Sequence, residues 1–161
     1  MKLQGKEQQA FQRREWSFQR VGTIVLVAFI LAGFLGFLGT GPLATTTRSS
    51  ANSVVTVEYD WVARAKADND VRIVLPPRAV EDGTVTLELT GSWLSGVDIE
   101  TISPEPVEQQ AIPNGVALTF NVEHSDEVDV SLSVVPRELF SHEAKLTVSG
   151  ESVSFNQFVL P

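Results

Sequence analysis

The sequence predicts an all-β domain, an immunoglobulin-like β-sandwich, preceded by one N-terminal transmembrane α-helix. Two observations carry this prediction. Residues 21–38 form an uncharged run without Asn, Gln or Pro, and residues 53–161 alternate between apolar and polar side chains in short runs separated by turn residues. A long apolar run is typical of a membrane helix, whereas a period of two is typical of strands with one buried face.

The chain of 161 residues carries its charge unevenly. Residues 1–20 hold five basic and two acidic side chains, whereas residues 44–161 hold seven basic and eighteen acidic ones, a net charge of −11. The positive flank of a membrane helix stays in the cytoplasm, so we expect a single-pass protein of the bacterial inner membrane with its C-terminal domain in the periplasm. The acidic domain argues against nucleic-acid binding.

Residues 1–20 are predicted to form a basic cytoplasmic segment beside the membrane. Its basic and aromatic side chains suit the headgroup layer. The residues expected at the membrane interface are Arg13, Arg14, Trp16 and Arg20.

Residues 21–38 are the predicted membrane span. Eighteen helical residues cover about 27 Å, close to the roughly 30 Å of a bilayer's hydrocarbon core. A cleaved signal peptide is the alternative, but its apolar region runs only about 7–15 residues. Cleavage after Ala44 would also place Pro42 where a small residue is required. We therefore expect a retained signal-anchor.

A row of small residues marks one side of this helix. Small side chains let helix backbones approach closely, so the row predicts packing on another membrane helix or self-association. The helix-packing residues are Ala28, Ala32, Gly33, Gly36 and Gly39. Residues 39–52 follow as a polar Thr- and Ser-rich linker with little expected structure, and Pro42 ends the helix.

The β-domain, residues 53–161, is predicted from eight or nine short alternating runs. These runs lie at 55–61, 71–75, 85–89, 97–101, 116–122, 128–134, 144–148 and 153–155, with a further short one at 107–111. The break in alternation at Gln157-Phe158 predicts a bulge or the end of pairing. No helix is expected in this domain. Two sheets packed on their apolar faces satisfy the pattern, and a small barrel is the alternative.

Aromatic and C-terminal apolar residues are candidates for both core and surface. Trp61 and Trp93 are expected to anchor the core, although Trp93 follows Gly91 and also suits an exposed loop. The C-terminal residues suit a buried last strand, but an exposed apolar end would indicate a partner. The candidate partner contacts are Trp93, Phe158, Val159 and Leu160.

No catalytic, cofactor-binding or metal-ligating residue emerges from the sequence. His124 and His142 both fall in predicted turns, and their spacing from acidic residues matches no metal loop. The segment 68–70 opens like a calcium loop but lacks the glycine and distal glutamate of one. No nucleophile or phosphate-binding motif is present, and no Cys. We expect a protein that is not an enzyme and needs no cofactor.

Four segments resemble an uncharacterised group of small bacterial single-pass membrane proteins. They are QRREWSFQRVGTIVLVAFILAGFLGFLGTGPL, VEYDWVARAKA, ISPEPVE and the ending FNQFVLP. The resemblance implies one anchor, an extracytoplasmic β-domain and an accessory role beside polytopic membrane proteins, with no activity carried over.

Three functions remain open from the sequence. The first, which we prefer, is an accessory interaction subunit whose helix packs on a larger integral membrane protein that the β-domain covers. The second is an envelope ligand-binding or sensing domain that signals through the helix. The third is a homo-oligomeric structural membrane protein assembled through the small-residue row.

Overall fold

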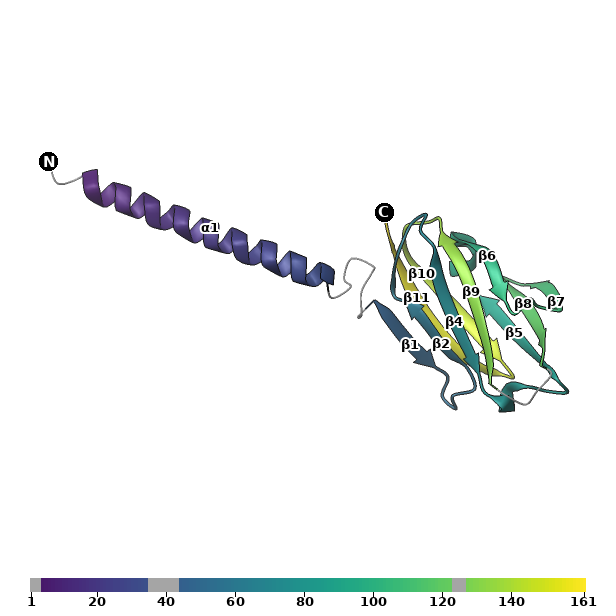
Figure 1. Cartoon of the computed structure of the whole chain (residues 1–161). Coiled ribbons are helices and arrows are strands. Elements are labelled where there is room, and N and C mark those ends of the chain that lie inside the picture. Colours follow the sequence, from purple (N-terminus) through teal and green to yellow (C-terminus); the bar gives the residue numbers. More distant parts are fainter. Residues whose placement is uncertain (1–3, 35–43, 123–126) are drawn as a thin grey trace.

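The computed structural model describes residues 4–34, 44–122 and 127–161, with side chains from residue 19 onward. Helix α1, Gln4–Phe34, precedes a β-domain (Figure 1). Searching the described residues finds no helical stretch with both the length and the hydropathy needed to cross a membrane. The predicted span, residues 21–38, extends past Phe34 and so ends outside the described residues.

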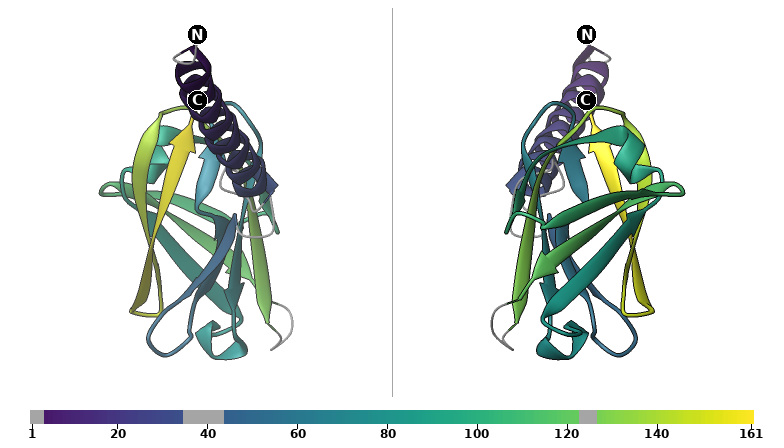
Figure 2. Two further views of the ribbon diagram at one scale, coloured as in Figure 1. Left: turned by 90° about the vertical axis from the view of Figure 1, so that its left-hand side faces the viewer. Right: turned by 90° about the vertical axis from the view of Figure 1, so that its right-hand side faces the viewer.

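The β-domain consists of two stacked sheets, as Figures 1 and 2 show. The five-stranded sheet has the order β1-β2-β4-β9-β6, formed by Thr45–Ser49, Thr56–Asp60, Asn69–Leu75, Val128–Pro136 and Val97–Ser103. The six-stranded sheet has the order β3-β11-β10-β5-β8-β7, formed by Val62–Arg64, Glu151–Leu160, Phe140–Val148, Thr84–Thr90, Gly115–Asn121 and Glu108–Ile112. Neighbouring strands are antiparallel except β3 and β11. Short helices are η1, Pro77–Ala79, and α2, Trp93–Gly96.

The core lies between the sheets, where the inward side chains of both meet. In β4 and β9, Val, Ile and Leu at every second position are buried, and the residues between them face outward. This is the period-two pattern of strands with one buried face. The domain is therefore a β-sandwich, as predicted, and the barrel alternative is wrong. Its eleven described strands exceed the seven or nine of immunoglobulin domains. The structure therefore supports a β-sandwich but not the specific immunoglobulin-like type.

Strand β1 lies inside the segment predicted to be an unstructured linker. It pairs along its whole length with β2, and Thr45 Oγ1 donates to Asp60 Oδ1 at 2.8 Å. Threonine favours extended backbone because its branched side chain fits a pleated surface. The buried Ala44 accepts a hydrogen bond from the Trp61 amide at 3.0 Å. The chain therefore joins the domain at Ala44, and the linker prediction for 45–49 is wrong.

Strand β11 continues through the position where a bulge was predicted. Its pairing with β10 runs without interruption from Phe140↔Val159 to Val148↔Glu151. The alternation breaks in sequence because Gln157, a polar residue, occupies an inward position. The irregular register lies instead in β6, between Ile99 and Thr101. The helix α2 was also not predicted, since four residues are too few to show a helical period.

An ion pair between β4 and β9 gives the domain a defined pH response. Arg72 Nε donates to both carboxylate oxygens of Asp129, at 3.0 and 2.9 Å. This hydrogen bond lowers the pKa of Asp129 below its ordinary value of 3.8. A depressed folded pKa means that the pair stabilises the fold above the unfolded pKa, and that this contribution is lost as pH falls through the folded pKa.

We therefore expect the melting temperature of the natural protein to fall more steeply between about pH 5 and pH 2 than that of Asp129→Asn. The difference will be small, because both side chains are about half exposed and solvent screens the pair. Thermal unfolding at a series of pH values checks this. Parallel profiles for the two proteins would contradict it.

Candidate interaction site

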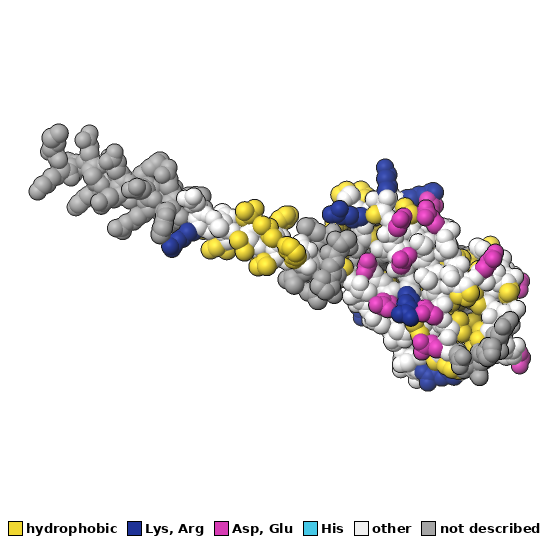
Figure 3. Space-filling view, viewed as in Figure 1, with side chains coloured by type: hydrophobic (Ala, Val, Ile, Leu, Met, Phe, Trp, Pro, Cys, Tyr) yellow, Lys and Arg dark blue, Asp and Glu magenta, His cyan; other side chains and the backbone are white. Residues whose placement is uncertain are grey.

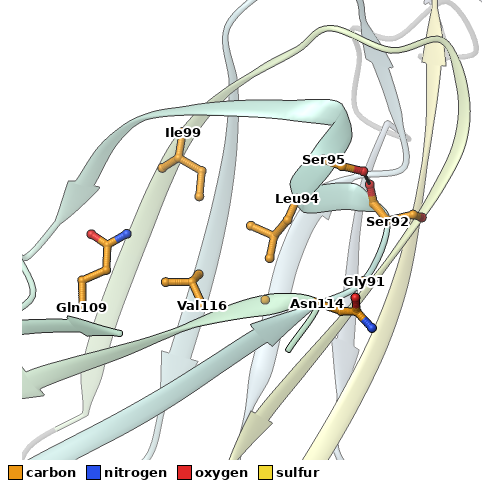
Figure 4. A pocket seen from close by; sticks show the side chains of 9 residues that line it. Gly91, Ser92, Leu94, Ser95, Ile99, Gln109, Asn114 and Val116 are labelled. Carbon is orange, nitrogen blue, oxygen red and sulfur yellow. Dashed lines mark hydrogen bonds between the residues drawn. The ribbon is translucent and has the colours of Figure 1, made fainter. Parts of the chain in front are cut away.

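The chain crosses between the two sheets on both long sides of the sandwich. On one side the chain passes from β2 through Trp61 into β3, and the Phe158 amide donates to the Trp61 carbonyl at 2.8 Å. Backbone thus crosses between the sheets and closes that side. On the opposite side, β6 ends one sheet and β7 ends the other, and residues 104–107 connect these two strands across the side. Between these strands lies a pocket of about 580 Å³, which we call the open-side pocket (Figure 4).

The open-side pocket has an apolar floor with polar groups around it. Leu94 from α2, Ile99 from β6 and Val116 from β8 point into it in Figure 4. All three are half-buried and pack against the core. Gln109 from β7 and Asn114 from the turn before β8 supply amide groups. The pocket can therefore hold an apolar group and hydrogen-bond a neighbouring polar one.

The inner face of β7 continues the floor of the pocket as an uncovered strip. Gln109 pairs with Leu118, which faces the core, so Gln109 also lies on the inner face. No strand of the described chain covers it, because the other sheet ends at β6. Val107, whose amide donates to Thr119 at 2.8 Å, is 57% exposed for the same reason.

Two turns fix the end of the pocket. The Gly91 amide donates to the Asn114 carbonyl at 3.1 Å, which joins the bend after β5 to the turn before β8. Asn114 adopts a positive φ of 57°, as expected for the predicted turn at 113–115. Ser92 Oγ accepts a hydrogen bond from the Glu143 amide at 3.2 Å. These contacts hold α2 and therefore Leu94 at the pocket.

A buried polar cluster holds α2 from beneath. Trp93 Nε1 donates to Gln157 Oε1 at 2.8 Å, and Gln157 Nε2 donates to the Asp60 carbonyl and to Asn69 Oδ1, both at 2.9 Å. The indole ring also packs edge-on against the ring of Phe155, with 5.6 Å between the two ring centroids. Sequence reasoning missed Gln157 and Asn69, although the break in alternation at Gln157 was the available signal.

Charge divides the domain into two halves. Residues 79–136 contain eleven acidic side chains and no Lys or Arg, whereas residues 44–78 and 137–161 together contain seven of each sign. The acidic stretch forms β9 and β6 of one sheet and β5, β8 and β7 of the other, which lie on the same side of the sandwich (Figure 1). In Figure 3, accordingly, magenta side chains but no dark blue ones lie along the right-hand edge of the domain. The open-side pocket lies in this acidic half.

His142 is buried, which contradicts its predicted place in a solvated turn. Strand β10 begins at Phe140, earlier than predicted, so His142 reaches the inner face and is 8% exposed. Its ring lies against Gly96, and Nε2 has no hydrogen-bond partner in the described structure. His124 lies outside the described residues. Among the described residues, no three His, Asp or Glu side chains are grouped as a metal site would require.

The four candidate partner contacts divide into buried and accessible residues. Trp93 and Val159 are fully buried, so the prediction that they contact a partner is wrong. Phe158 is 41% exposed, and Leu160 is half-buried at the end of β11. Trp61, expected in the core, is 37% exposed because it lies in the crossing between the sheets.

The structure describes only some of the candidate helix-packing residues. Ala28 is exposed on α1, and Ala32 and Gly33 are half-buried. Gly36 and Gly39 lie outside the described residues. The proposed packing therefore stays a prediction.

The candidate membrane-interface residues all lie within α1. Arg20 is exposed and has an interaction partner. The side chains of Arg13, Arg14 and Trp16 lie outside the described part of the structure. Their place at a headgroup layer also stays a prediction.

No known protein family and no curated protein matches the chain. Among solved structures, a cohesin module of a Clostridium perfringens family 33 glycoside hydrolase is similar, with 12% identity and a TM-score of 0.48 over 71% of this chain and 98% of that one. Domains 4 and 5 of the S-layer protein SbsC give 9% identity and a TM-score of 0.41 over 76% and 55%. The N-terminal periplasmic domain of ScsB from Proteus mirabilis gives 11% and 0.38 over 71% and 51%. Likenesses this distant carry no information about function.

Proposed function

We propose that the chain is a membrane-anchored accessory subunit whose β-domain is an extracytoplasmic interaction module. The observation that carries this proposal is the open-side pocket, whose apolar floor adjoins the uncovered inner face of β7 with Gln109. A concave site with an apolar floor and a few polar groups is the usual form of a binding site. The uncharged run at 21–38 and the basic residues before it support the anchor and its orientation.

The short tether supports a partner in the same membrane. Only residues 35–43 separate Phe34 from Ala44, where the chain joins the domain. Ten Cα–Cα steps reach at most roughly 35 Å. The domain thus stays close to the end of α1, within reach of the outer loops of a neighbouring membrane protein. The likeness in plan to small bacterial single-pass membrane proteins supports the same role.

Crosslinking in native membranes tests this function. A photoreactive residue in place of Ala28 should capture a polytopic membrane protein in stoichiometric yield, and the pair should survive purification in mild detergent. Ala32→Leu, which fills the small-residue row, should reduce co-purification about tenfold, whereas Ile30→Leu on the other side of the helix should not. A lone monomer without crosslinks would refute the proposal, and capture of only a second copy would favour the homo-oligomer.

A ligand-binding or sensing domain is the second candidate, favoured by the size of the pocket. Its volume of about 580 Å³ lies within the 300–1,000 Å³ of small-molecule sites. A thermal-shift screen of the full chain with sugars, lipids and Ca²⁺ tests it. A ligand that raises the melting temperature through the pocket would favour this function, and a flat screen would count against it.

A further inference from the structure

We infer that the open-side pocket receives an extended, cationic segment of a partner protein, with an apolar side chain in the pocket and Lys or Arg beside it. This inference rests on the proposed function and names the chemistry of the partner. It follows from three features of the acidic half: the shape of the gap between β6 and β7, the apolar floor, and the distribution of charge.

The gap suits one extended backbone. Strands β6 and β7 are the last strands of two stacked sheets, and stacked sheets lie about 10 Å apart. Between α2 and the crossing at residues 104–107, a single extended segment fits along such a gap and directs alternate side chains toward the floor. There, Leu94, Ile99 and Val116 are only half-buried, and Val107 is more than half exposed. An apolar anchor would remove this surface from water.

Charge selects a cationic segment. Glu100 lies at the irregular position of β6 after Ile99, and Glu108 precedes Gln109 on β7 and faces outward opposite Thr119; both are exposed. Residues 79–136 contain no Lys or Arg, and the two arginines that form ion pairs with this stretch, Arg72 and Arg137, contact Asp129 and Asp98. Such a predominantly acidic surface raises the association rate of a positive ligand and disfavours a negative one.

The same charge argues against other occupants of the pocket. A second copy would bring a second acidic half, with eleven acidic and no basic residues, against the first. The basic residues of 1–20 precede the anchor and lie across the membrane from the pocket in the proposed orientation. The irregular register of β6 at Ile99/Thr101 also weakens simple strand pairing between copies.

Peptide binding to the full chain in neutral detergent tests the inference. The probe is a fluorescent octapeptide of alternating Lys and Leu, compared with peptides in which Glu replaces Lys or Ser replaces Leu. Fluorescence anisotropy should show binding of the Lys–Leu peptide that weakens with salt, and at least about tenfold weaker binding of the two others. Equal binding of the Ser-containing peptide, or no binding of the Lys–Leu peptide, would overturn the inference.

Matched variants distinguish peptide binding at the open-side pocket from non-specific electrostatic attraction to an acidic protein. Glu100→Lys with Glu108→Lys should weaken the Lys–Leu peptide at least about tenfold. Asp68→Lys with Asp70→Lys changes the net charge equally on the neutral half and should change affinity less than about twofold. Gln109→Trp, an exposed position that would occlude the pocket, should also abolish binding while leaving the melting temperature unchanged. Equal losses in the two charge variants would overturn the inference.

A second crosslinking experiment distinguishes failure of this inference from failure of the proposed function. A photoreactive residue at Gln109 should crosslink a basic, extended segment of the partner captured from Ala28, whereas one at the exposed Ser154 on β11 should not. If Ala28 captures a partner and Gln109 does not, the proposed function stands and the inference is wrong.

Discussion

Gln157→Ala is expected to destabilise the β-domain by about 3–5 kcal/mol, the largest loss for any single polar residue of the domain. Gln157 is fully buried and makes three hydrogen bonds, to Trp93, Asp60 and Asn69. Alanine would leave a cavity and three polar groups without partners in the core. Urea unfolding of the full chain in mild detergent, followed by the strand signal in circular dichroism, measures the change.

Two further variants make this prediction specific. Asn156→Ala alters the exposed neighbour in the same strand and should change stability by less than about 0.5 kcal/mol. Gln157→Leu should cost less in a Trp93→Phe background than alone, because the indole donor then no longer needs a partner. A cost below about 1 kcal/mol for Gln157→Ala would show that the cluster does not stabilise the fold.

Gly91→Ala is expected to cost about 3 kcal/mol or more, through two separate effects. Gly91 has a φ of +117°, which residues with a Cβ rarely adopt, and a Cβ there would overlap the backbone carbonyl of Glu143. Relieving the overlap would move the bend that places α2 at the pocket. Thermal and urea unfolding should show the loss, and peptide binding at the open-side pocket should weaken with it.

Gly83 and Gly115 separate the two effects. Gly83 also has a positive φ, but a Cβ there meets only the Val122 carbonyl at 3.8 Å, so Gly83→Ala should cost about 1 kcal/mol. Gly115 lacks the positive φ, and a Cβ there would overlap the Leu89 carbonyl. Gly115→Ala should therefore fall between the other two. Equal costs for Gly83→Ala and Gly91→Ala would contradict the argument from overlap.

The strands whose environment alternates strictly were predictable from the sequence. In β9, the residues from Val128 to Val134 alternate between the core and the outer face. The polarity of the side chain therefore indicates on which face each residue lies. Strand β1 was not predictable, because Thr, Arg and Ser at an exposed edge show no apolar period. Gln157 and His142 were misinterpreted for a related reason: a polar residue on an inward face resembles the end of a strand until its partners are known.

The candidate site was beyond sequence reasoning for a different reason. The open-side pocket exists because β6 and β7 end different sheets on the same side, and this depends on pairings between distant parts of the chain. The absence of Lys and Arg from residues 79–136 is visible in the sequence. Their meaning appears only when the fold gathers that stretch into one half of the sandwich.

The pairing of β1 with β2 limits how far the β-domain can lie from the end of α1. Strand β1 is an edge strand that pairs with β2 and also contacts β11, and Ala44 joins it to residues 35–43. A pull on the tether would load the hydrogen bonds between Thr45 and Asp60 first and break the pairs one after another. Release of residues 44–52 would add nine residues, roughly 30 Å of reach. The reach of the β-domain from the end of α1 therefore depends on whether β1 stays paired with β2.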